Sequence, residues 1–124
     1  MVASPKINID SSDLAGAIED TYSAKGGITA YAGGGQANAV ALIHSFNRVS
    51  TVASAADSVK LPAAKAGASL IVFNKAATNS MNVFPATGDT INALSANAAY
   101  ALAVTKGAMF VCCEDGKWDT ILTA

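Results

Sequence analysis

The sequence predicts an all-β fold, a jelly-roll-like β-sandwich or barrel of short antiparallel strands, preceded by a short N-terminal arm or helix. Two observations carry this prediction. From residue 38 onward, short segments rich in β-branched residues recur about ten residues apart. Glycine, proline, asparagine and aspartate separate these segments, and these residue types favour turns. A chain of 124 residues is also long enough to bury the core of a single domain.

The first 26 residues differ from the rest, so residues 1–26 and 27–124 are predicted to be separate regions. The stretch "DSSDLAGAIEDTYS" begins with three polar residues that can cap a helix, and Leu14 and Ile18 follow four residues apart, on one helix face. A helix of about two turns needs a surface to pack on. The alternative is an extended arm that orders only against a partner. Either way, Leu14 and Ile18 are candidate partner-interface residues.

Three consecutive glycines at residues 33–35 are the next feature. A glycine-rich loop can bind phosphate, but a P-loop also needs a lysine followed by serine or threonine and then a helix. Gln36 and Ala37 occupy those places here. The run therefore indicates a flexible loop or a close approach of two backbones.

The β-region follows as nine short segments without an apparent internal repeat. Residues 68–74, "ASLIVFN", are continuously apolar, which is typical of a strand covered on both faces. The alanine-rich residues before Tyr100 would also suit a helix, although the nearby asparagines disfavour one. The predicted strands are residues 39–45, 47–53, 57–62, 68–74, 80–85, 90–94, 99–104, 108–113 and 117–122.

Residues 79–94, "NSMNVFPATGDTINAL", predict two strands joined by a hairpin loop at "PATGD". Alternation places Met81, Val83 and Ile91 toward the core, and Asn82 and Asp89 toward solvent. The segment indicates a scaffold rather than a ligand site. Its asparagines are expected to bond to the backbone; they are Asn79, Asn82, Asn92 and Asn97.

A second hairpin is predicted at the C-terminal end, with Asp115-Gly116 as its two-residue loop. Counting outward from the loop gives the expected pairs. They are Glu114 with Lys117, Cys113 with Trp118, Val111 with Thr120, and Met109 with Leu122. The last three pairs are assigned to the core. Phe110 and Ile121 then fall on the opposite face, where another element or subunit would have to cover them, so both are candidate partner-interface residues.

Charge is sparse and evenly spread. Charged residues make up 14% of the chain, against about 25% in an ordinary soluble domain. The net charge is −1, and the chain has a single arginine, so no basic patch predicts nucleic-acid binding. No apolar run reaches membrane-spanning length, and the first residues do not form a secretory signal. The low charge suits either lasting contact with other subunits or a monomer whose surface is rich in alanine, serine and threonine.

No motif predicts catalysis, a cofactor or a metal. His44 is the only histidine, so a nucleophile–base pair would depend on it alone. The adjacent acids Glu114 and Asp115 fit a solvated turn, and the oxygen ligands of a calcium loop are missing. Cys112 and Cys113 are neighbours, which makes a disulfide between them geometrically poor; one thiol should be buried and one exposed, both reduced. We expect a protein that is not an enzyme.

The stretches "GGGQANAVAL", "NRVSTVASAADSVKLPAAKAGASLIVFNKAATNSMNVFPATGDTINAL" and "FVCCEDGKWDTIL" together resemble capsid cement, or decoration, proteins of tailed bacteriophages. The resemblance covers residues 27–124. It implies a virion protein on the capsid exterior, assembled in the host cytoplasm, which binds the phage major capsid protein and stabilises contacts between capsid subunits. It also implies a homo-oligomer, a dimer or trimer, with no active site, membrane or nucleic-acid partner. The alternative is a β-domain of a phage tail or head fibre involved in host attachment.

Overall fold

The computed structural model describes residues 22–33 and 35–124. Throughout this part of the chain the regular elements are β-strands, which confirms the all-β prediction. The predicted helix anchors Leu14 and Ile18 lie outside the described residues. The strands are β1 (Ala24–Thr29), β2 (Val40–Ala41), β3 (Phe46–Thr51), β4 (Ser58–Lys60), β5 (Ser69–Asn74), β6 (Met81–Phe84), β7 (Thr90–Ile91), β8 (Tyr100–Leu102), β9 (Gly107–Glu114) and β10 (Lys117–Leu122).

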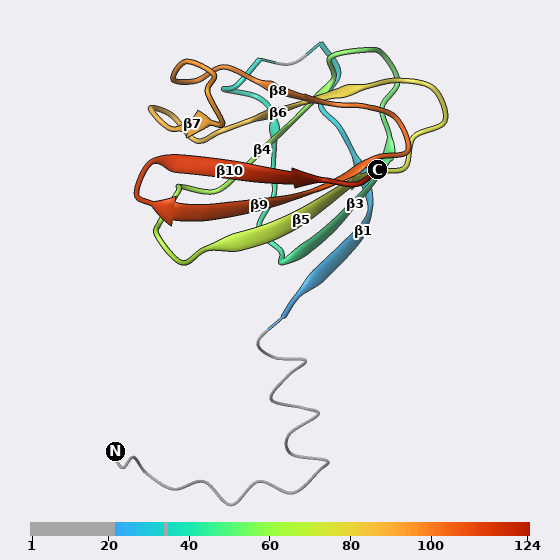
Figure 1. The fold of residues 1–124 in the computed structure, drawn as a ribbon. Coiled ribbons are helices and arrows are strands. Elements are labelled where there is room, and N and C mark those ends of the chain that lie inside the picture. The colour runs from blue at the N-terminus through green and yellow to red at the C-terminus, as the bar shows by residue number, and fades with distance from the viewer. Residues whose placement is uncertain (1–21, 34) are drawn as a thin grey trace, which may run out of the picture.

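The strands form two sheets that lie one above the other (Figure 1). The larger sheet has the order β1-β3-β5-β9-β10-β7, and the smaller has the order β2-β4-β6-β8. Inward side chains from both sheets fill the space between them. Fully buried members of this core include Val49, Val59, Val72, Met81, Val83, Leu102, Phe110 and Trp118.

Successive turns of the chain stack on one another as coils. In the larger sheet β1, β3 and β5 pair in parallel, and in the smaller sheet β2, β4 and β6 do the same. The arrangement is β-solenoid-like, and five of the eight strand pairings are parallel. The predicted antiparallel jelly roll is therefore wrong. Polar–apolar alternation identifies the buried face of a strand, and it does not identify the neighbouring strand.

The coils form a geometric repeat that the sequence does not display. Along the larger sheet, Ala24 pairs with Phe46 and Phe46 pairs with Ile71, at separations of 22 and 25 residues. In the smaller sheet, separations of 19 and 24 residues join the row Val40, Val59 and Val83. Because the loops between strands differ in length, no fixed period marks the coils in the sequence.

β8 and β9 cover the third coil, and we call this end of the stack the closed end. β9 pairs antiparallel with β5, and β8 pairs antiparallel with β6, so both strands of the third coil gain a neighbour. Tyr100 of β8 meets Phe110 of β9 edge-to-face, with ring centroids 5.9 Å apart. Such a pair stabilises the contact beyond its buried area alone.

The hairpin predicted within residues 79–94 does not form. β6 belongs to the smaller sheet, whereas β7 pairs in parallel with β10 in the larger sheet. The "PATGD" loop therefore crosses between the two sheets. The inward positions were nevertheless predicted correctly, because Met81, Val83 and Ile91 are all fully buried.

The C-terminal hairpin forms at Asp115-Gly116, as predicted, with Gly116 at a φ of 83°. Lys117 pairs with Glu114 across the turn, and its Nζ lies 3.3 Å from Glu114 Oε1. Beyond this pair the predicted register is wrong by one residue. Trp118 pairs with Cys112, which leaves Cys113 as the extra residue of a β-bulge.

The bulge reverses the assignment of faces on β9. Phe110 was predicted to point outward but is fully buried, because each residue before the bulge is turned to the other face. Met109 was predicted to lie in the core but is 36% exposed, and it pairs with Ile121, which is 64% exposed. Trp118 is buried, as predicted. Of the two interface candidates in this hairpin, only Ile121 lies on the surface.

Candidate functional site

The first coil leaves one end of the stack open. β1 is the outermost strand of the larger sheet and β2 is the outermost strand of the smaller one, so each has one edge without a strand partner in the described part of the chain. Unpaired strand edges carry backbone N–H and C=O groups that can pair with another extended chain. This open end is the first candidate site.

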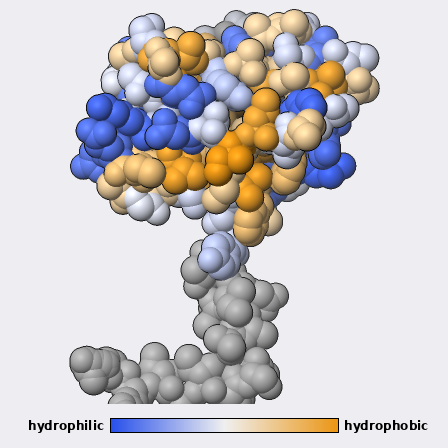
Figure 2. Space-filling model, viewed as in Figure 1, coloured by the Kyte–Doolittle hydropathy of each residue, from blue (hydrophilic) through white to orange (hydrophobic). Residues whose placement is uncertain are grey.

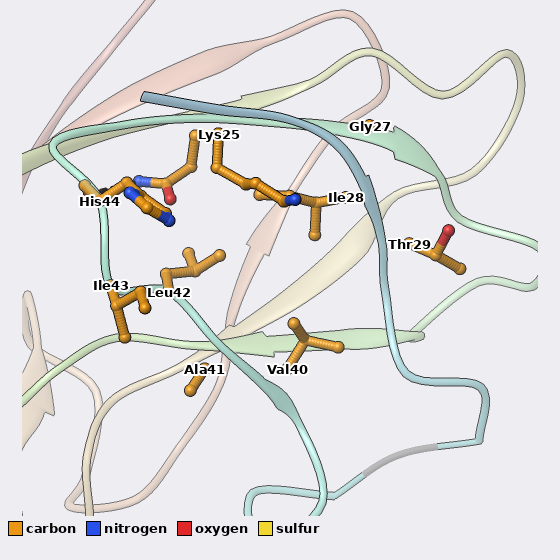
Figure 3. Close-up of a pocket in the computed structure, with 10 residues that line it drawn as sticks. Lys25, Gly27, Ile28, Thr29, Val40, Ala41, Leu42, Ile43 and His44 are labelled. Atoms are coloured by element: carbon orange, nitrogen blue, oxygen red, sulfur yellow. Dashed lines mark hydrogen bonds between the residues drawn. The ribbon is translucent and has the colours of Figure 1, made fainter. Parts of the chain in front are cut away.

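A hollow of about 310 Å³ lies at the open end (Figure 3). It is bounded by β1 on one side and by β2 with the following loop on the other, and Lys25 is its one charged lining residue. In Figure 3, Lys25 and His44 lie near one end of the hollow and Thr29 lies near the other. The lining residues are Lys25, Gly27, Ile28, Thr29, Val40, Ala41, Leu42, Ile43, His44 and Asn47.

Two buried polar atoms of this lining have no hydrogen-bond partner, Asn47 Oδ1 and His44 Nδ1. Asn47 is 1% exposed, and its Nδ2 donates to His44 O at 2.8 Å and to Ile71 O at 3.2 Å. Those two bonds orient the amide and leave Oδ1 as a free acceptor. A buried polar group without a partner is costly, so a donor from a bound segment would be stabilising.

Asn74, one coil further along on β5, is also a buried asparagine, and both polar atoms of its side chain have hydrogen-bond partners. Its Nδ2 donates to Asn79 O at 2.9 Å and to Leu102 O at 3.0 Å, and its Oδ1 accepts from Ala76 N at 3.1 Å. The difference is local, because Asn74 Oδ1 accepts from an N–H two residues further along the chain, whereas Asn47 Oδ1 on β3 has no such donor.

The open end can therefore accept an extended, largely apolar segment. The strand edges offer backbone pairing, the hollow can take a small apolar side chain, and Asn47 Oδ1 can accept one N–H. Its lining contains no carboxylate, serine or cysteine that would pair with His44 as a catalytic group.

The glycine run contacts a carboxylate of the chain itself. Gly33, with a φ of 66°, donates its N–H to Asp57 Oδ1 at 3.1 Å. The other oxygen of Asp57 accepts from Ser54 N at 3.0 Å. Asp57 is 1% exposed, so these bonds compensate the burial of a carboxylate. Sequence reasoning missed this residue, although an aspartate just before a strand is a common turn signal.

The other acidic and amide residues discussed in the sequence analysis mostly hydrogen-bond to backbone groups of loops. Asp89 accepts from Ala64 N at 2.8 Å, and Asp115 accepts from Ala66 N at 2.9 Å. Asn79 donates to two backbone carbonyls, and the carbonyl oxygens of Asn92 and Asn97 accept backbone N–H groups, as predicted. These bonds fix loops rather than form a site.

The outer face of the larger sheet is the second candidate surface. Figure 2 shows hydrophobic residues gathered on this face. Five residues in register across five strands form a row, which we call the apolar strip: Ala24, Phe46, Ile71, Met109 and Ile121. The strip contains Ile121 from the predicted interface residues, and it excludes Phe110, which points into the core.

Residues 22–33 and 35–124 bring together no group of three or more metal-ligating side chains. No helix within these ranges has the length and apolarity needed to cross a membrane. One of the two adjacent thiols is buried and one is exposed, and both are free, as predicted. The predicted register placed Cys113 in the core, which is wrong: Cys112 is the buried thiol, because the bulge pairs it with Trp118.

Comparison of the chain with protein-family models, with curated proteins and with solved structures gives no match.

Proposed function

We propose that this chain is a capsid cement, or decoration, protein of a tailed bacteriophage. It would bind the outer surface of the assembled head and stabilise contacts between major capsid subunits. The observation that carries this proposal is the hollow at the open end, which lies between the edge strands β1 and β2 and is lined by a residue with an unpartnered buried acceptor. An open end with unpaired edges and a free buried acceptor suits completion by a segment of another polypeptide.

Two properties of the chain support a role based on contact. Only 14% of its residues are charged, so contact with a capsid surface requires little desolvation of charge. Paired coils also provide a scaffold that resists deformation, because each strand of the middle coil has a neighbour on both sides. The proposed location is the exterior of the virion, reached after assembly in the host cytoplasm.

Residues 1–21 are proposed to add a second attachment point, with Leu14 and Ile18 as apolar anchors. They precede β1, the edge strand of the open end. Two linked attachment points strengthen binding through effective concentration, even where each is weak. Deleting residues 1–20 should leave a folded domain that loads onto capsids weakly or not at all.

The test mixes purified full-length protein with capsids that lack it. Copies bound per particle and the temperature of capsid disruption are measured. We expect saturable binding and a higher disruption temperature. Ile43→Asp changes a side chain that is 77% exposed at the hollow, and it should weaken loading about tenfold or more by placing a charge in the contact.

Leu94→Asp is the matched control, since Leu94 is exposed and lies outside both the hollow and the strip. Its loading should equal that of the unchanged protein. If the full-length protein neither binds the particles nor alters their stability, and instead adheres to host cells, the fibre role replaces the cement role.

A further inference from the structure

The outer face of the larger sheet is apolar and uncovered in the described part of the chain. On the apolar strip, Phe46 is 41% exposed and Ile121 is 64% exposed. Five of the eight exposed large hydrophobic residues in the described ranges lie on or beside the strip: Tyr22, Phe46, Met109, Ile121 and Leu122. Such a concentrated patch is typical of a surface that another element or molecule covers.

A second row on the same face extends the apolar surface toward the ends of β3 and β5. Phe73 lies two residues beyond Ile71 on β5 and pairs with Arg48 of β3. The Phe73 ring lies over Gly107 of β9, where a Cβ would collide with it. Glycine at this position therefore lets the ring occupy the space over β9, where it adds to the apolar face.

Tyr22 joins the preceding residues to this face. Its ring stacks on Phe46, with centroids 5.9 Å apart and planes inclined by 26°. Phe46 belongs to the strip, so Tyr22 lies on the outer face of the sheet rather than in the hollow at the open end. Residues 1–21 end at Tyr22, and their last residue is therefore next to the strip. A tethered segment has a high effective concentration at a surface within its reach.

Residues 1–21 are opposite in charge to the rest of the chain. They contain four acids and one lysine, which gives a net charge of −3. Because the whole chain carries −1, residues 22–124 carry +2. Opposite net charges attract the segment to the domain and raise the rate of encounter.

We propose that residues 11–20 form a helix that packs on the outer face of the larger sheet, above β3 and β5, within the same chain. The segment has an apolar pair, Leu14 and Ile18, and a helix of this length needs a surface to pack on. The strip and Phe73 supply that surface directly beside the residue at which the segment ends.

The spacing of a helix matches the rows of the sheet. A helix rises about 1.5 Å per residue, so Ile18 and Leu14 follow Tyr22 at about 6 and 12 Å. Outward side chains on one strand are about 6.6 Å apart. Ile18 therefore falls at the strip, and Leu14 falls at Phe73, one row further. In an extended arm the same pair would be about 13 Å apart and would skip a row.

The same path brings acids to the basic side of the strip. Asp10 and Asp13 precede Leu14, so they lie beyond the Phe73 row, toward the ends of β3 and β5. Arg48 is exposed there, and Lys75 Nζ lies 5.6 Å from the centroid of the Phe73 ring. Neither cation forms an ion pair within residues 22–33 and 35–124.

The acid on this face lies elsewhere. Asp119 of β10 precedes Ile121 by two residues, whereas Arg48 of β3 follows Phe46 by two. β3 and β10 run in the same direction, so Asp119 is on the opposite side of the strip and does not face the proposed position of the acids.

This packing would occupy the two side chains proposed as capsid anchors. Leu14 and Ile18 cannot contact the sheet and a capsid at the same time, so the helix would have to leave the strip when the protein loads. That release rests on the proposed function. The packing in the free chain does not.

The test measures amide hydrogen exchange of residues 12–20 in the full-length protein, without capsids. We expect exchange at least about tenfold slower than in a free peptide of residues 1–21, and equally slow at about 10 and 300 µM protein. Leu14→Asp and Phe46→Asp should each remove most of this protection, because they place a charge at an apolar contact. Leu14→Asp alters neither sheet, so its effect would not come from unfolding of the domain.

Two matched controls accompany these variants. Ile43→Asp changes a residue that is 77% exposed and lies away from the strip, and it should leave the protection unchanged. Arg48→Glu combined with Lys75→Glu should reduce the protection about threefold or more at low salt, and less at about 1 M salt. Lys60→Glu, on β4 of the smaller sheet, should have no effect.

Three results would overturn the proposal. They are the absence of protection in the unchanged chain, protection that survives both Leu14→Asp and Phe46→Asp, and protection that rises with protein concentration. The last would place another copy on this face. Failure of the capsid proposal is a separate result, because the exchange measurement contains no capsids. A packed helix in a protein that does not load onto capsids would retain this inference and remove the cement role.

Discussion

The two ends of the coil stack are built from similar strands but differ in how the buried polar side chains near them are hydrogen-bonded. At the closed end, β5 and β6 are paired with β9 and β8, and the buried amide of Asn74 has all of its partners. At the open end, β1 and β2 have free edges, as β7 and β8 do at the other end, and Asn47 Oδ1 and His44 Nδ1 beside the hollow lack partners. We propose that the open end is the one that another chain completes.

The count of unpartnered atoms supports this contrast. Four buried side-chain polar atoms in the described residues lack a hydrogen-bond partner, and two of them line the hollow at the open end. The other two are Ser58 Oγ and Trp118 Nε1. Natural domains leave few such groups, so the two residues at this hollow are in keeping with the proposed completion by another chain.

The largest expected effect concerns the closed end. Phe110→Ala should lower the free energy of unfolding by about 3–5 kcal/mol, because it opens a cavity under a fully buried ring. Urea denaturation followed by Trp118 fluorescence measures it. The matched change Phe46→Ala, on a ring that is 41% exposed, should cost less than about 1.5 kcal/mol in monomeric protein. Equal losses would contradict the assignment of Phe110 to the core.

The two buried asparagines provide the next test. Asn74→Ala should cost about 2–4 kcal/mol, because it leaves two carbonyls and one N–H without partners. Asn47→Ala also removes two donated hydrogen bonds, but it removes a buried acceptor that had no partner as well. Its loss in the free energy of unfolding should therefore be about 1–2 kcal/mol smaller than that of Asn74→Ala. Denaturant titrations of both variants give the difference. A larger loss for Asn47 would show that the open end is not the weaker one.

The two thiols should differ in reactivity. Cys113 is exposed and should be alkylated in the native protein, whereas Cys112 is buried with its Sγ 3.1 Å from Glu114 O. Mass spectrometry after alkylation without reductant should show one modification in the native state and two after unfolding. Two native modifications would mean that the bulge next to the closed end opens readily. No modification after unfolding would indicate a disulfide.

The smallest effect is expected at the hairpin tip. Lys117→Ala removes an ion pair whose side chains are 59% and 71% exposed, so it should change stability by less than about 0.5 kcal/mol. The hairpin is fixed by its turn and by the burial of Trp118 instead. A decrease of more than about 1 kcal/mol in the free energy of unfolding, measured by denaturant titration, would indicate that this pair supports the register of β9 and β10.

Local features of this fold could be predicted from the sequence. Alternation correctly placed Met81, Val83 and Ile91 inward, and the Asp115-Gly116 turn was placed correctly. These features depend on residues close together in the chain. A turn is fixed by the backbone preferences of its own residues, and alternation reports the burial of one strand.

The pairing of strands could not be predicted in the same way. Parallel neighbours such as β3 and β5 are joined through a whole coil of variable length, so no short signal specifies them. The bulge at Cys113 lacks a glycine or proline to mark it, and its single extra residue reversed the predicted faces of Met109 and Phe110. The open end depends on the coil stack, so the hollow could not be anticipated before the stack was known.

Hydrogen exchange of the protein alone and bound to capsids tests whether the open end is the binding site. If the open end is completed by a capsid segment, amides of β1 and β2 should exchange more slowly in the bound state, by about tenfold or more, while those of β8, β9 and β10 stay unchanged. Protection confined to the closed end, or capsid binding without any change in β1 and β2, would contradict the assignment of the open end as the binding site.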